Sequence, residues 1–185
     1  MNILEQSDEW KKKADRLLDE KGLVKILSEF GQVHFTGAYS YGLMMHGDID
    51  VSVVREKPYT TEETMKIFET LYYNGNFRSY FIGGDWDDPR KGAEFPVGKY
   101  IGLKEKINGE RWKIDLWFIS ADEFAKRKNE SDESVLINMS EEKKKLILEC
   151  KKFRNENKFE ITGKQIYDLV IGDKVKNSVE IRNFI

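Results

Sequence analysis

The sequence predicts an α+β domain in which helices pack on one face of a β-sheet of about five strands, followed by a helical C-terminal segment. Residues 97–107 and 110–119 alternate apolar and polar side chains, as half-buried strands do. Residues 7–30 and the segment after Thr60 repeat apolar side chains at the spacing of an amphipathic helix. Beyond residue 120 the apolar patterns have the helical period, so the predicted strands all precede it.

The composition is that of a globular protein with a heavily solvated surface. The chain has 185 residues, of which 35% are charged and 39% hydrophobic, with a net charge of −2. This length allows one domain with a core of its own. Gripping a long nucleic-acid backbone requires a clustered excess of Lys and Arg, because the affinity comes from releasing the counterions of the phosphates. We therefore do not expect nucleic acid to be a partner.

The sequence also bears on where the protein resides. Its single cysteine, Cys150, excludes an internal disulfide and any cysteine-based zinc site within one chain. Residues 1–13 are polar and lack the apolar region of a signal peptide. No apolar run reaches the length of a membrane span. We expect a cytoplasmic protein without a membrane partner.

The N-terminal elements follow from caps and glycines. Ser7-Asp8-Glu9 offers a start for the helices within residues 7–30, and Gly31 ends the pattern. Residues 33–36 are short and apolar enough to form a strand. The chain then makes a tight turn into a short helix that extends to Met45, and residues 48–54 form the next strand.

The middle of the chain begins with a strong helix start at Thr60-Thr61-Glu62-Glu63. Residues 77–82 can form a strand. Residues 83–96 form the longest irregular stretch, rich in Gly, Asp and Pro, and such loops in compact domains are more often functional than merely connective. Its aspartates, Asp85, Asp87 and Asp88, lack the spacing of a calcium loop, and we interpret them as loop residues.

A hairpin and a run of helices complete the chain. Asn108-Gly109 is a strong signal for a tight turn between the strands on either side of it. Residues 141–152 and 164–171 have helical patterns. We expect an α/β core over residues 1–120, with residues 121–185 as a helical segment packed on the same domain.

Three aspartates form the candidate site. Side chains alternate along a strand, so Asp48 and Asp50 share one face while Ile49 lies on the other. Two carboxylates about 6–7 Å apart repel each other, which indicates a cationic partner. Asp115 lies on a second strand whose opposite face is apolar, and it emerges on the same side if both strands cover the same helices.

Oxygen ligands of this kind suit a hard cation. Mg²⁺ is typically held by one or two carboxylates together with substrate phosphates, and such ions stabilise the in-line displacement of a phosphoryl group. Gly37 follows the preceding strand, where a glycine allows the backbone to turn closely around a phosphate.

On these residues the sequence resembles the polymerase-beta-type nucleotidyltransferase superfamily. The turn is Thr36-Gly37-Ala38, the paired ligands are Asp48-Ile49-Asp50-Val51, and the third carboxylate lies in Lys113-Ile114-Asp115-Leu116-Trp117. The match covers most of residues 31–120, whereas the helical tail is not diagnostic. The resemblance implies the nucleotidyltransferase fold with a mixed sheet. It also implies transfer of a nucleoside monophosphate from a nucleoside triphosphate, such as ATP, to a hydroxyl of a small molecule or protein, with release of pyrophosphate.

The resemblance assigns roles to named residues. Asp48, Asp50 and Asp115 are then the catalytic and metal-binding residues, with Mg²⁺, or alternatively Mn²⁺, as cofactor. Asp115 is the candidate acceptor of the proton of the attacking hydroxyl. The predicted nucleotide-binding residues are Gly37, Ala38, Ser40 and Lys113.

Alternative interpretations stay open. Ala38 stands where the family usually has Gly or Ser, and Tyr41 where an Arg is frequent, so the same fold can also be a catalytically silent nucleotide- or partner-binding module. An RNA-end-modifying enzyme is a third possibility, against which the acidic balance argues. His46 is close enough to Asp48 to orient a carboxylate or a phosphate, whereas we interpret His34 as a packed or edge side chain of a strand.

Overall fold

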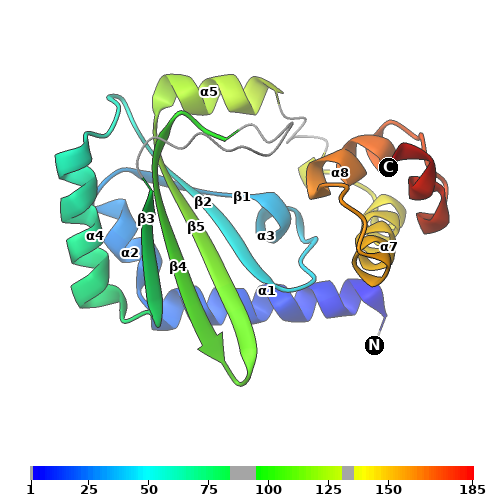
Figure 1. Cartoon of the computed structure of the whole chain (residues 1–185), viewed down its shortest axis with the longest axis horizontal. Coiled ribbons are helices and arrows are strands. Elements are labelled where there is room, and N and C mark those ends of the chain that lie inside the picture. Colours follow the sequence, from blue (N-terminus) through cyan, green and yellow to red (C-terminus); the bar gives the residue numbers. More distant parts are fainter. Residues whose placement is uncertain (1, 84–94, 131–135) are drawn as a thin grey trace.

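A computed structural model describes residues 2–83, 95–130 and 136–185 of the chain (Figure 1). Most of the irregular stretch predicted at 83–96, including its three aspartates, lies outside the described residues.

The centre of the fold is a five-stranded sheet with the strand order β1-β2-β5-β4-β3. Strands β2 and β5 run parallel, and every other neighbouring pair is antiparallel. The sheet is therefore mixed, which confirms the predicted α+β class with about five strands. The strands are β1 (Gln32–Thr36), β2 (Gly47–Arg55), β3 (Ser79–Gly83), β4 (Gly98–Ile107) and β5 (Glu110–Ser120).

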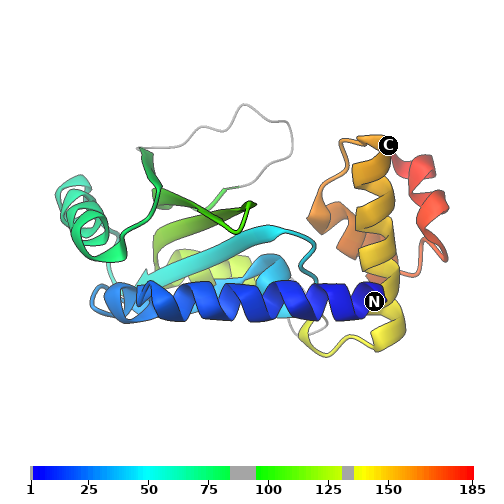
Figure 2. The same cartoon turned by 90° about the horizontal axis from the view of Figure 1, so that it is seen from below.

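Helices α1 (Ile3–Glu20), α2 (Leu23–Ser28) and α4 (Thr61–Gly75) cover one face of this sheet. Figure 2 shows α1 running beneath the strands. The buried side chains of Ile49 on β2 and Ile114 on β5 belong to the same hydrophobic cluster as residues of all three helices. The face of the sheet that carries the aspartates is the opposite one.

Helix α1 begins at Ile3, four residues before the predicted capping serine. Asn2 caps it, with a reciprocal capping box in which Asn2 and Glu5 bond each other's backbone N–H groups. Ser7 is instead a buried helix residue, and its hydroxyl donates to the carbonyl of Gly42 over 2.9 Å. The predicted cap was wrong because Asn2 and Glu5 supply the box, whereas the Ser7 hydroxyl has a tertiary partner.

The link between β1 and β2 is the short helix α3 (Gly37–Tyr41), which begins without an intervening turn and ends earlier than predicted. Gly37 and Gly42 bound it, with φ values of +65° and +67°. Both are in the left-handed region that favours glycine, which lets the chain leave one strand and return towards the next within a few residues.

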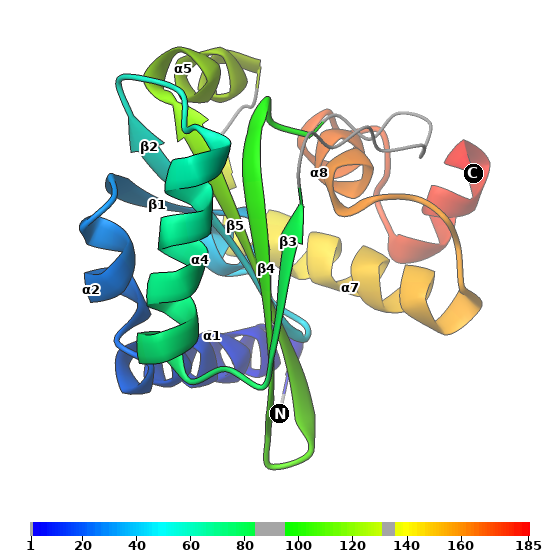
Figure 3. The ribbon, with the colours of Figure 1, turned by 60° about the vertical axis from the view of Figure 1, so that its left-hand side comes forward.

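The C-terminal segment forms a second hydrophobic cluster beside the sheet. Figure 3 shows α7 and α8 on the side away from α4. Tyr41 and Leu43 from the α/β core are buried in this cluster together with residues of α7 and α8. The division into 1–120 and 121–185 stays a prediction. The elements after the sheet are α5 (Ala121–Glu130), α7 (Glu141–Asn157), α8 (Gly163–Ile171) and the 3₁₀ helix η1 (Ser178–Phe184).

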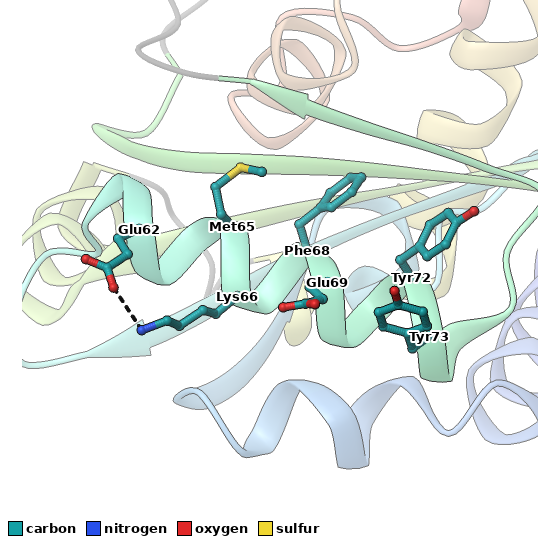
Figure 4. Close-up of a pocket in the computed structure, with 7 residues that line it drawn as sticks. All are labelled: Glu62, Met65, Lys66, Phe68, Glu69, Tyr72 and Tyr73. Carbon is teal, nitrogen blue, oxygen red and sulfur yellow. Dashed lines mark hydrogen bonds and ion pairs between the residues drawn. The ribbon is translucent and has the colours of Figure 1, made fainter.

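Helix α4 carries an aromatic groove on its outer surface, shown in Figure 4. Tyr72 and Tyr73 are mostly exposed there, and Phe68 stacks on Tyr72 with ring centroids 6.5 Å apart. None of its lining residues is a predicted site residue. Among the described helices, none is both long and apolar enough to cross a membrane.

Candidate functional site

The parallel pairing of β2 with β5 brings the predicted carboxylates side by side. Asp50 is the register partner of Asp115, and Asp48 is the register partner of Lys113. Register partners project to the same face of a sheet, so these four side chains form a group across two neighbouring strands. The intervening Ile49 is fully buried on the helical face.

The aspartate-bearing face is covered farther along the same strands. Ser52 and Trp117, which follow the carboxylates at the same alternation, are both buried, and the Trp117 ring packs against those of Phe95 and Tyr100. The carboxylates therefore lie at the end of this face that precedes the buried Ser52 and Trp117. These aromatic rings cover the face beyond the carboxylates.

Both carboxylate oxygens of Asp115 have partners. The Tyr100 hydroxyl donates to Oδ1 over 2.7 Å, and the Lys113 ammonium lies 2.5 Å from Oδ2. Gly102, the register partner of Asp115 on β4, makes this possible, because a Cβ there would lie 2.6 Å from the Tyr100 hydroxyl oxygen. The absence of a side chain at Gly102 thus lets Tyr100 reach across to Asp115.

The Asp50 carboxylate is largely removed from solvent. Burial, followed by the negative charges of Asp48 and Asp115, raises the pKa of Asp50 to about 7. Gly37 packs directly against the Asp50 carboxylate, so closely that a Cβ at position 37 would overlap its Oδ2 atom. Gly37 is therefore needed to accommodate a metal-ligand candidate, in addition to the backbone turn for which the sequence analysis selected it.

One carboxylate oxygen of Asp48 has no hydrogen-bond partner among the described residues and can serve as a metal ligand. This atom, Oδ1, is buried. A buried carboxylate oxygen without a donor is costly unless a cation satisfies it, so Asp48 and Asp50 suit a hard divalent ion. Among the described residues, however, no three acidic, histidine or cysteine side chains converge enough to hold a metal.

The remaining predicted nucleotide-binding residues lie on α3. Ala38 packs against both hydrophobic clusters, and its carbonyl accepts the N–H groups of Gly42 and Leu43 at the end of the helix. Ser40 is partly exposed on the same turn. Contact of Gly37, Ala38, Ser40 or Lys113 with a nucleotide stays a prediction, as do the metal and catalytic roles of the three aspartates.

The two histidines lie in different surroundings. His46 is exposed immediately before β2, two residues from Asp48, and its suggested orienting role stays a prediction. His34 on β1 packs against Phe124 of α5, with ring centroids 4.4 Å apart. This contact agrees with its interpretation as a packed residue.

Lys151 on α7 is a polar residue of this region that the sequence analysis missed. It is 5% exposed and donates to the Leu43 carbonyl over 2.8 Å and to the Tyr167 hydroxyl over 3.3 Å. Burial lowers the pKa of Lys151 to about 8, against the opposing effect of the charges of Asp48 and Asp50. Lys151 lies one turn after Ile147 and Leu148 on the apolar side of the helix, and this spacing was the sequence signal for its burial.

No protein-family model and no curated protein sequence matches the chain. Solved structures do match. The polymerase core of TRAMP, an RNA surveillance complex, aligns with a TM-score of 0.53 and 16% identity over 94% of this chain and 52% of that one. The non-canonical poly(A) polymerase complex GLD-2–GLD-3 aligns with a TM-score of 0.54 and 15% identity over 92% of this chain and 57% of that one. The GLD-2/RNP-8 complex aligns with a TM-score of 0.55 and 13% identity over 98% of this chain and 66% of that one.

These likenesses show a shared fold, and the chain spans about half to two thirds of the length of the chains it matches. They contradict the expectation that nucleic acid is not a partner, because the neighbours are poly(A) polymerases and the polymerase core of an RNA surveillance complex. That expectation relied on net charge. Net charge sums over the whole surface and does not describe a local site that binds only a few phosphates.

Proposed function

Given that the chain has the fold of the polymerase-beta-type nucleotidyltransferases, we propose that it is a metal-dependent nucleotidyltransferase. It transfers a nucleoside monophosphate from a nucleoside triphosphate to a hydroxyl and releases pyrophosphate. The observation that supports this most is the group of Asp48, Asp50 and Asp115 on adjacent parallel strands, with a buried Asp48 oxygen that lacks a donor.

In this proposal Asp48 and Asp50 hold Mg²⁺ or Mn²⁺, and Asp115 completes the acidic group. When bound, the ion neutralises the charge that develops on the transferred phosphoryl group. Asp115 accepts the proton of the attacking hydroxyl, and the Tyr100 hydroxyl orients its carboxylate over 2.7 Å.

The triphosphate needs donors as well as metal. The Lys113 ammonium lies among the carboxylates, and its side chain is 51% exposed, so it can meet an entering phosphate. Helix α3, which contains Gly37, Ala38 and Ser40, directly follows β1, and Gly37 packs against Asp50. This position supports a role for the backbone of α3 beside the same phosphates. ATP is the triphosphate we test first.

The acceptor is a hydroxyl of a small molecule or of a protein. A second candidate is the terminal hydroxyl of an RNA, which the likeness to polymerase cores favours. The two differ in their response to salt, because binding to an RNA chain weakens steeply as counterions are added and binding to an uncharged small acceptor does not.

The test is a labelling assay with Mg²⁺ and each α-³²P nucleoside triphosphate. The acceptors are an RNA oligonucleotide, a pool of hydroxyl compounds and the protein itself. Wild-type protein is expected to transfer label to one of these, and the Asp48→Ala/Asp50→Ala variant is expected not to. Equal labelling by both would contradict the proposal. Mg²⁺-dependent nucleotide binding without turnover would instead identify the catalytically silent module.

A further inference from the structure

Lys113 is the one cation in direct contact with the carboxylate group among the interactions described. It lies directly beside Asp48 across the β2–β5 pair, and two residues before Asp115 on its own strand. Three carboxylates and one ammonium therefore occupy four neighbouring positions on one face of β2 and β5.

The Lys113 ammonium forms its ion pair with one of these three carboxylates. Lys113 pairs with Asp115 at 2.5 Å, while the buried Oδ1 of Asp48, on the strand beside it, has no donor. The Asp115 side chain is only 13% exposed, so little water competes for this contact. The Tyr100 hydroxyl holds the other oxygen of Asp115.

The arrangement is supported from the neighbouring strand. Tyr100 reaches Asp115 over the bare backbone of Gly102, whose missing side chain leaves room for the phenol. Asp115 is thus fixed by a neutral donor on one oxygen and a cationic donor on the other. The contact with Lys113 is the part that can open, because that side chain is half exposed.

We propose that Lys113 is the resident counter-ion of the carboxylate site and competes with a divalent cation for Asp115, so that its charge sets how tightly the metal binds. The proposal rests on the proposed metal-dependent function and adds a positioning residue to it. Without metal, Lys113 offsets part of the repulsion among the three aspartates. With Lys113 in place, Asp48 and Asp50 are the carboxylates open to an ion.

Electrostatics gives the direction of the effect. A unit positive charge a few ångströms from a divalent ion weakens its binding, and burial reduces the screening of that repulsion. Replacing Lys113 with a neutral side chain removes the repulsion and also frees Oδ2 of Asp115 as a ligand. Both changes increase the affinity for the ion.

The experiment measures Mn²⁺ binding to the full chain without nucleotide, with free Mn²⁺ counted by electron paramagnetic resonance. Lys113→Gln removes the charge, and Lys113→Arg keeps it. Lys104→Gln is the matched control, because Lys104 is the register partner of Lys113 on β4, one strand farther from β2. Asp50→Asn removes a proposed ligand. Circular dichroism checks that each variant is folded, and Lys113→Met replaces Lys113→Gln if the latter is not.

The expected result is a dissociation constant about tenfold lower for Lys113→Gln, with Lys113→Arg and Lys104→Gln within about twofold of wild type. Wild-type binding that Lys113→Gln leaves unchanged or weakens, while Asp50→Asn abolishes it, would overturn the role of Lys113 and leave the proposed function standing. If neither wild type nor Lys113→Gln binds Mn²⁺, with or without ATP, the metal-dependent function itself fails, and this inference fails with it.

Discussion

At Asp50 the protein keeps a carboxylate in a place that disfavours its charge. Burial and the charges of Asp48 and Asp115 raise its pKa to about 7, from about 4 in an unfolded chain. A raised pKa in the folded state means that ionising the group favours unfolding. Stability from this residue is therefore present below about pH 4 and is lost as the pH rises through about 7.

Asp50→Asn removes this penalty. In metal-free buffer at pH 8.5 the variant is expected to unfold with a free energy higher than wild type by on the order of 3 kcal/mol, with the advantage shrinking toward pH 5. Urea denaturation at several pH values measures this difference in unfolding free energy. Asp8→Asn, at an exposed site, is the control and should show no such trend. If Asp50→Asn raises the unfolding free energy equally at every pH, the raised pKa of Asp50 is contradicted.

Gly37 and Gly42 form a natural pair for testing close packing against the carboxylate. Both have left-handed backbones, with φ of +65° and +67°, yet a Cβ at Gly37 would overlap Asp50, whereas a Cβ at Gly42 would meet nothing within 4 Å. Gly42→Ala is expected to destabilise by about 1 kcal/mol through the backbone alone. Gly37→Ala should destabilise by at least about 2 kcal/mol more, since the overlap adds to the same strain.

A double variant separates the two contributions at position 37. In an Asp50→Ala background the overlap with the carboxylate is removed, so Gly37→Ala should lose most of its additional effect. Equal destabilisation by Gly37→Ala in both backgrounds would show that the contact with Asp50 is not the reason for glycine. Thermal and urea unfolding of the four proteins measure the cycle.

At the scale of elements, local signals and tertiary contacts both decide where helices begin. Helix α4 starts where the sequence predicts, with the Thr60 hydroxyl accepting from the Glu63 N–H over 3.2 Å and the Glu63 carboxylate accepting from the Thr60 N–H over 2.8 Å. Arg55 then pairs with the same carboxylate at 2.7 Å, which ties the end of β2 to the start of α4.

Thr60→Ala removes the hydroxyl half of this box and leaves a helix N–H without its acceptor. The expected loss is about 1 kcal/mol of unfolding free energy. Thr61→Ala changes the next residue, which is exposed and inside the helix, and should cost much less. Similar losses for both variants, measured by chemical denaturation, would indicate a helix start other than Thr60.

At the scale of the whole molecule, the C-terminal helices share a core with the α/β part. Leu43 and Tyr41 precede β2 in the chain but are buried among residues of α7 and α8. Lys151 joins the same parts through the Leu43 carbonyl, over 2.8 Å. A segment that buries its apolar residues against the core in this way is expected to unfold with it.

Two probes test this coupling. All four tryptophans precede residue 121, so their fluorescence reports on the α/β part, while far-ultraviolet circular dichroism is dominated by helices throughout. We expect the two denaturation curves to coincide. Leu43→Ala should shift both together by about 2–4 kcal/mol, and Met65→Ala, at a side chain that is 49% exposed, should shift neither appreciably. Separate transitions would show that residues 121–185 unfold independently.

The sequence by itself predicted most of the helices and strands, and it predicted that Asp48 and Asp50 share one face of a strand. Alternation along a strand is a local property, so it follows from the residue order that these two carboxylates share a face. Asn108-Gly109 specified the hairpin, and the Thr60 box specified α4, for the same local reason. The resemblance carried by the glycine turn, the two spaced aspartates and Asp115 was enough to predict the fold.

Only the tertiary structure decided how the site residues are arranged and which side chains surround them. The register that places Asp50 beside Asp115 and Asp48 beside Lys113 depends on how two distant strands pair, which no local pattern contains. The same holds for the Tyr100 contact over Gly102 and for Lys151, which arrives from a helix about a hundred residues later. Charge and burial at a site are sums over neighbours in space, and the chain order does not list those neighbours.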